Sequence, residues 1–199
     1  MIKKINILLC IIAITGGLFI AFTKDDSLVL ILKDSSIIFT ITGIYLVEKI
    51  LKIKINEYIK FIYISFIFMA HFVGVTLEVY NHVYWFDKFT HFISGIVTSL
   101  LAILILIKEK NNNKLLFNVL FILSFSMLIA SLWEVFEFLA SYYFKVDPQR
   151  VALTGVTDTM GDIIVAFLGS ILVSISYYFE HKENYNLIIR NFEKVSQIK

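Results

Sequence analysis

The chain has 199 residues, of which 58% are hydrophobic and 17% charged, and its formal net charge is +2. Soluble domains are about half apolar and about a quarter charged, so this composition excludes an ordinary soluble protein and favours an integral membrane protein. The positive charge lies in short loops, which suits lipid headgroups and argues against nucleic acid as a partner. The single cysteine, Cys10, excludes an intrachain disulfide.

Six apolar runs follow one another along the chain, each long enough to cross a hydrocarbon core of about 30 Å. They are predicted to be helices, because lipid leaves no solvent partner for backbone N–H and C=O groups. The fold class is therefore all-α, a polytopic bundle of about six transmembrane helices. The predicted spans are residues 5–22, 35–51, 58–77, 85–107, 115–143 and 155–179. The apolar stretch 28–32 either extends the second helix or lies at the membrane interface.

Residues 1–179 are predicted to form a single transmembrane domain, followed by a charged cytoplasmic tail at 180–199. Lysine and arginine are more abundant in one alternating set of loops, which the positive-inside rule places in the cytoplasm. Both termini are therefore expected on the cytoplasmic side of the cell membrane, the inner membrane where a cell has two. The richer set is Lys3, Lys4, Lys49, Lys52, Lys54, Lys60, Lys108, Lys110, Lys114, Lys182, Arg190, Lys194 and Lys199.

Three pairs of ionisable residues occur inside predicted spans, where charge is costly and marks a functional site by default. The members of each pair are three or four residues apart, so they share one helix face. In the assigned topology all three pairs lie towards the outer leaflet, while the inner halves of these helices are nearly free of charge. The pairs are Asp87 with His91, Glu134 with Glu137, and Asp158 with Asp162.

This polar centre is predicted to bind a divalent metal ion such as Mg, Mn, Ca or Zn through all six residues. His91, Glu134 and Glu137 are also the candidate catalytic groups. Three other interpretations stay open. The carboxylates could be protonated as in a proton relay, they could pair with Lys88 or Arg150, or Asp87 and Asp158 could cap helix ends.

Several other residues are expected to be structural. His71 lies deeper and alone, which is typical of a satisfied buried histidine. Gly95, Gly161 and Gly169 favour close helix packing. Five serines have no special context and belong to no known catalytic motif: Ser94, Ser124, Ser126, Ser131 and Ser141. No polar path to the cytoplasm is visible, which favours an enzyme over a transporter.

At these residues the chain resembles the YjdF family of uncharacterised bacterial inner-membrane proteins, and more distantly the VanZ-like proteins. The resemblance rests on Asp87-x-x-x-His91-Phe92-x-x-Gly95, Glu134-x-x-Glu137, and Asp158-Thr159-x-x-Asp162 with Gly169 after it. Phe86 stands where the family typically has tyrosine. The resemblance implies about six helices and supports the polar site, but it implies no reaction.

Two classes of function are therefore carried forward. The first is a metal-dependent enzyme that acts on a lipid or lipid-linked envelope substrate. The alternative is a small transporter with a proton or ion relay, or a non-catalytic membrane factor. Membrane lipids are the expected partners in each case.

Overall fold

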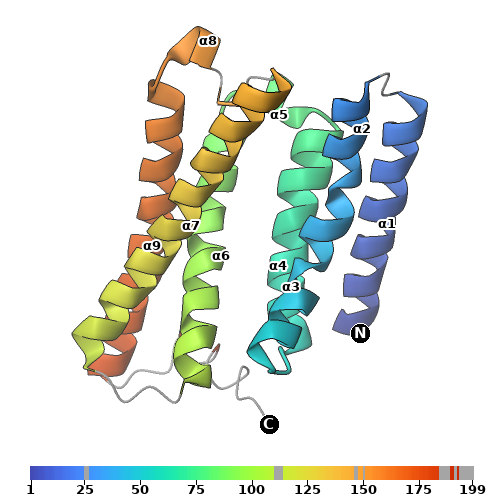
Figure 1. The fold of residues 1–199 in the computed structure, drawn as a ribbon. Helices are drawn as coiled ribbons and strands as arrows, with labels where there is room; N and C mark the ends of the chain where they lie inside the picture. Colours follow the sequence, from blue (N-terminus) through green and yellow to red (C-terminus); the bar gives the residue numbers. More distant parts are fainter. Residues whose placement is uncertain are drawn as a thin grey trace. The chain divides into compact units, whose positions relative to one another are not determined.

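The computed structural model describes residues 1–24, 27–109, 114–145, 148–149, 151–183, 189–190 and 192. Within these residues every regular element is a helix (Figure 1). Six helical segments are long and apolar enough to cross a membrane, which confirms the predicted all-α fold class. These segments are Ile2–Thr23, Leu28–Ile50, Glu57–Thr76, Phe86–Lys108, Leu115–Phe144 and Thr157–Lys182.

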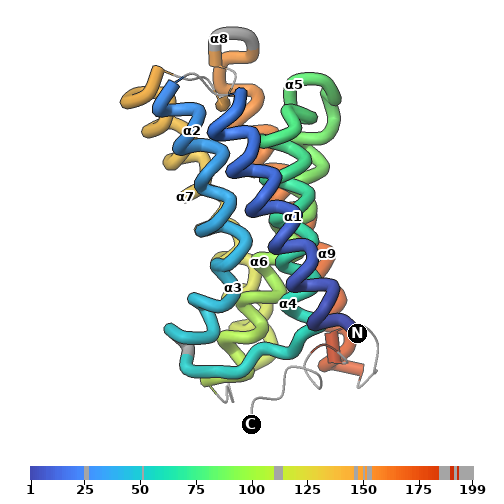
Figure 2. Tube along the Cα trace, turned by 90° about the vertical axis from the view of Figure 1, so that its right-hand side faces the viewer, coloured from blue at the N-terminus to red at the C-terminus, as the bar shows by residue number. Residues whose placement is uncertain are grey.

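The chain divides into two compact units, unit 1 from Met1 to Thr90 and unit 2 from His91 onward. In unit 1, helix α1 packs against the second and third candidate spans, and each of those spans consists of two elements. Figure 2 shows the second span as α2 leading directly into α3. The elements of unit 1 are α1 (Ile2–Thr23), α2 (Leu28–Ser35), α3 (Ile37–Leu51), α4 (Glu57–Ile67), the π-helix η1 (Phe68–Thr76) and α5 (Val79–His82).

The junction between α2 and α3 settles the alternative left open for the stretch 28–32, because this stretch extends the second span. The hydroxyl of Ser36 donates to the carbonyl oxygen of Lys33 at 2.6 Å, a bond that competes with the helix ladder. Just before the junction, Asp34 is buried and accepts a hydrogen bond of 3.3 Å from the Thr76 hydroxyl. The junction is thus tied to η1.

Lys60 falls within the predicted span 58–77 and is counted with the cytoplasmic positive charges at its start, where a solvated side chain is expected, but the structure buries it. It lies in α4 with only 5% of its surface exposed. Its ammonium group lies 3.0 Å from Glu48 and 3.1 Å from Glu57, because a lysine can stay charged when buried only beside opposite charges. His71 is expected to be a satisfied structural histidine, and the structure bears this out only in part: its Nδ1 lies 3.0 Å from the Thr40 hydroxyl, whereas its buried Nε2 has no hydrogen-bond partner among the described residues.

Unit 2 contains α7 (Leu115–Phe144), the short α8 (Val151–Thr154), α9 (Thr157–Lys182) and α6 (Phe86–Lys108) from His91 onward. Helix α7 packs along α9 and runs in the opposite direction to α6 and α9 (Figure 1). The bounds of these three long helices agree with the predicted spans to within three residues. Because α6 and α9 run the same way, residues early in both helices lie at the same end of unit 2.

The predicted tail at 180–199 falls mostly outside the described residues, as do Lys110, Arg150, Lys194 and Lys199. Helix α9 continues to Lys182, beyond the expected boundary at residue 179. The outward surface of α7 carries many exposed large apolar side chains, including Leu128, Leu132 and Phe136. Such a surface is unusual in water and ordinary in lipid.

Candidate metal centre

Two glycines hold α6 and α9 in close contact. A Cβ atom added at Gly95 would collide with the carbonyl oxygen of Ala166, and one added at Gly169 would collide with the carbonyl oxygen of Phe92. The backbones of the two helices can approach this closely because glycine has no side chain. The structure confirms the packing role predicted for Gly95 and Gly169. This contact limits the distance between His91, one turn before Gly95 on α6, and Asp162, two turns before Gly169 on α9.

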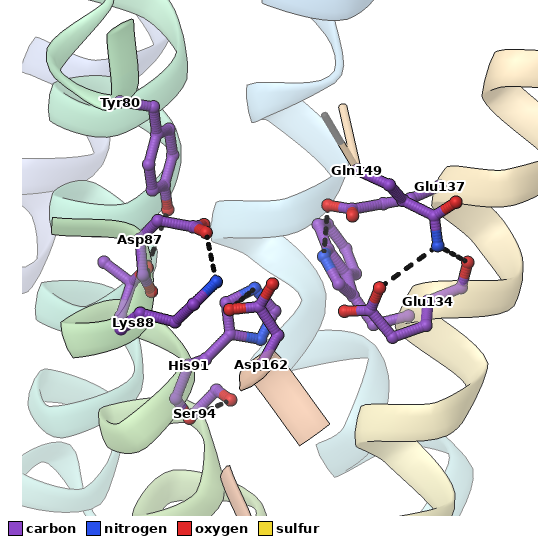
Figure 3. A network of polar contacts seen from close by, with 11 residues as sticks. Tyr80, Asp87, Lys88, His91, Ser94, Glu134, Glu137, Gln149 and Asp162 are labelled. Atoms are coloured by element: carbon purple, nitrogen blue, oxygen red, sulfur yellow. Dashed lines mark hydrogen bonds and ion pairs between the residues drawn. The ribbon is translucent and has the colours of Figure 1, made fainter. Parts of the chain in front are cut away.

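His91 and Asp162 face each other beside this contact. The Nε2 atom of His91 lies 3.8 Å from an Asp162 oxygen, and both side chains are largely removed from solvent. Asp87 precedes His91 by one turn of α6, so the two side chains lie on the same helix face. One ligand atom from each of Asp87, His91 and Asp162 lies within 4.8 Å of the other two. Figure 3 shows His91 and Asp162 turned towards each other below Asp87.

The spacing of these atoms suits a single cation. Two ligands of one ion are separated by at most about 4–5 Å, since metal–ligand bonds are about 2.0–2.5 Å long. Two carboxylates and one imidazole suit Mg, Mn or Ca, and the imidazole also admits Zn or Fe. The Asp87, His91 and Asp162 cluster, here called the metal cluster, could therefore hold a metal ion.

A lysine supplies positive charge beside the metal cluster. The ammonium group of Lys88 lies 3.3 Å from an oxygen of Asp87, and about a third of the Lys88 side chain is exposed. This is the lysine partner that the sequence offered as an alternative to a metal. Lys88 and a bound cation would therefore compete for the negative charge of Asp87.

The other three predicted site residues are placed differently. Asp158 is buried one turn before Asp162 on α9. Glu134 is buried on α7, where the Gln149 amide donates to its carboxylate at 3.2 Å and to its backbone oxygen at 3.0 Å. Glu137 accepts a hydrogen bond of 2.8 Å from the indole of Trp133. Asp158, Glu134 and Glu137 therefore lie outside the metal cluster found among the described residues.

Gln149 is a site residue that sequence reasoning missed. It lies in the connection between α7 and α8, it is buried, and it holds the Glu134 carboxylate in place (Figure 3). No sequence signal marks it, because a glutamine between two spans is normally solvated. The two hydrogen bonds from Gln149 fix the orientation of Glu134 on α7.

The chain matches the model of the family described as "Predicted membrane protein (DUF2238)" over residues 5–183. An uncharacterized protein of Thermotoga maritima is 30% identical over 126 residues, which is 63% of this chain and 64% of that relative. The chain thus spans less than two thirds of that relative's length. No solved structure matches. The family resemblance seen in the sequence is confirmed, and the chain belongs to the DUF2238 family of multi-pass membrane proteins.

Proposed function

We propose that the protein is a metal-dependent membrane enzyme that acts on a lipid or lipid-linked envelope substrate. The observation that carries this proposal is the convergence of Asp87, His91 and Asp162 near the start of α6 and α9. Three protein ligands leave coordination positions for water and for a substrate oxygen, as in catalytic metal sites. A purely structural cluster needs no such vacant positions.

The residues have distinct roles in this proposal. Asp87 and Asp162 hold the cation, and His91 is either a third ligand or a general base for the attacking water. Glu134 and Glu137 are the candidate groups that donate a proton to the leaving oxygen, and Asp158 supports the cation from the next turn of α9. The metal would polarise a phosphoryl or carbonyl oxygen of the substrate.

A lipid substrate is favoured by the position of the metal cluster. It lies near the start of two spans, where lipid headgroups lie, and the neighbouring Trp85 and Phe89 are exposed aromatic side chains. Aromatic residues are enriched at the membrane–water interface. With both termini in the cytoplasm, this end faces outward. A reporter fused after Lys199 should then behave as a cytoplasmic protein. If the reporter instead proves to lie outside the cell, the orientation is reversed and the metal cluster lies in the inner leaflet.

The proposal is tested with purified protein in detergent and short-chain phosphatidic acid or a short-chain polyprenyl diphosphate as probes. Phosphate release should require Mg, Mn or Zn, stop with EDTA and return when metal is restored. Asp162→Asn should lower the rate at least about tenfold, the scale of losing support for a metal. Asp34→Asn, which changes a buried aspartate in unit 1, is the matched control and should keep its activity. No metal-dependent release from either probe would contradict the proposal for phosphorylated lipids.

A further inference from the structure

Buried hydroxyl groups run along the interior of unit 2 beyond the metal cluster. On α9, Asp162, Ser170, Ser174 and Tyr177 are spaced by multiples of three or four residues, so they lie along one face of the helix. Helices α6 and α7 contribute the buried hydroxyls of Ser99 and Ser126 and the partly buried hydroxyl of Thr98. The set, here called the hydroxyl column, is Thr98, Ser99, Ser126, Ser170, Ser174 and Tyr177.

Hydrogen bonds link this column between helices. The hydroxyl oxygens of Thr98 and Ser126 lie 2.8 Å apart and join α6 to α7. The Ser126 hydroxyl also donates to the carbonyl oxygen of Gly95, one turn from His91, at 3.2 Å. At the other end, the amide of Asn118 on α7 donates to the Tyr177 hydroxyl at 3.1 Å. Ser126 belongs to no catalytic motif in the sequence, and in the structure it bonds to α6 through both Thr98 and Gly95.

Two serines in the middle of the column have open hydrogen-bonding capacity. Ser170 is 0% exposed and Ser174 is 3% exposed, and neither hydroxyl oxygen has a hydrogen-bond partner among the residues that the structure describes. Helical serines usually bond to a carbonyl one turn earlier, as Ser99 does with Gly95. A buried hydroxyl without a partner is costly, and internal water commonly satisfies such groups.

We propose that the hydroxyl column holds internal water and conducts protons between the metal cluster and the opposite end of unit 2. The distance along α9 from Asp162 to Tyr177 is about 22 Å at about 1.5 Å per residue, so water must bridge between the hydroxyls. A hydroxyl accepts one hydrogen bond while it donates another, which is what a proton needs to pass from oxygen to oxygen.

The chemistry of the column favours a proton over a metal ion. A divalent cation needs several oxygen ligands and compensating negative charge, whereas the six members of the column are neutral. Polar side chains lie at both ends of the column. His91 and Asp162 lie at one end, and at the other His181 stacks on Tyr177 with ring centroids 4.1 Å apart. The proposal requires neither a metal nor a lipid substrate at the cluster.

The test uses the full chain in liposomes loaded with a pH-sensitive dye, with a potassium diffusion potential imposed by valinomycin. Wild-type protein should acidify the lumen faster than protein-free liposomes do. The double variant Ser170→Ala and Ser174→Ala should lose most of this conduction, because it removes both hydroxyls and keeps the helix packing. Thr42→Ala is the control, since the Thr42 hydroxyl bonds within its own helix in unit 1.

Two results would overturn the proposal. One is a rate of lumen acidification with wild-type protein that equals the rate in protein-free liposomes. This comparison does not depend on whether a variant folds. The other is a double variant that conducts as fast as wild type. Neither result bears on metal-dependent phosphate release, so the two proposals fail separately.

Discussion

Two clusters of charged side chains, one around Lys60 and one at the start of α6 and α9, balance their buried charge differently. In unit 1, Lys60 lies between Glu48 and Glu57 on neighbouring helices, and Asn6 donates to Glu57 at 3.1 Å. The opposite charges come from within the protein and join α1, α3 and α4. Near the start of α6 and α9, Asp87 and Asp162 lie close to His91, whose charge depends on its protonation. The cluster around Lys60 joins helices through opposite charges, and the cluster of Asp87, His91 and Asp162 has the ligand spacing that could hold a cation.

The largest expected effect removes the lysine of unit 1. Lys60→Met should destabilise the protein by about 3–5 kcal/mol, because it leaves two carboxylates without their buried partner. Detergent-solubilised protein, unfolded thermally or with denaturant, gives the measurement. Lys33→Met is the control, since the Lys33 side chain is 37% exposed. A loss no larger than that of Lys33→Met would show that the unit 1 charges are not a structural lock.

The next effect acts on the framework of the metal cluster. Gly95→Ala should destabilise the protein by about 1–3 kcal/mol and weaken metal binding, because the new Cβ would meet the Ala166 carbonyl and push α6 away from α9. Gly155→Ala is a control with open space around it, although its φ of +60° adds strain of its own. Unfolding and metal titration are measured on both. Unchanged metal binding in Gly95→Ala would show that the metal cluster does not depend on the close contact between α6 and α9.

A smaller effect distinguishes the lysine from the metal. Lys88→Gln should tighten cation binding by roughly 0.2–1 kcal/mol, since it removes a partly exposed positive charge 3.3 Å from Asp87. Calorimetric titration with Mn or Zn measures the change. Weaker binding, together with lower stability, would show that Lys88 itself is the counter-ion of the cluster.

The smallest effect concerns Glu137. Glu137→Gln should leave metal affinity unchanged, because Glu137 lies outside the close group of ligands and glutamine can still accept the Trp133 hydrogen bond. If Glu137 is the proton donor proposed above, the reaction rate should fall in the same variant. A sharp loss of bound metal would instead make Glu137 a ligand, as the sequence alone suggests.

The sequence predicted the parts of this protein that depend on local pattern. Long apolar runs specify membrane helices, and the i, i+4 spacing of Asp87 and His91 puts both on one face. It could not predict the break at Ser36, which follows from a local hydroxyl bond, or the burial of Lys60. It also missed the hydroxyl column. Counting charges overlooks neutral serines, and the burial of Ser170 and Ser174 depends on how three helices pack.

The central claim is that the metal cluster of Asp87, His91 and Asp162 binds a cation. A titration that compares the metal affinity of wild type with that of Asp162→Asn tests this claim most directly. Purified wild type should bind close to one divalent ion per chain. Asp162→Asn should bind it about 10–100-fold more weakly while keeping or gaining stability without metal, because the variant buries one charge fewer. Asp34→Asn should bind as wild type does. Wild type that binds no divalent ion, or an Asp162→Asn variant that binds the ion as tightly as wild type, would contradict the account.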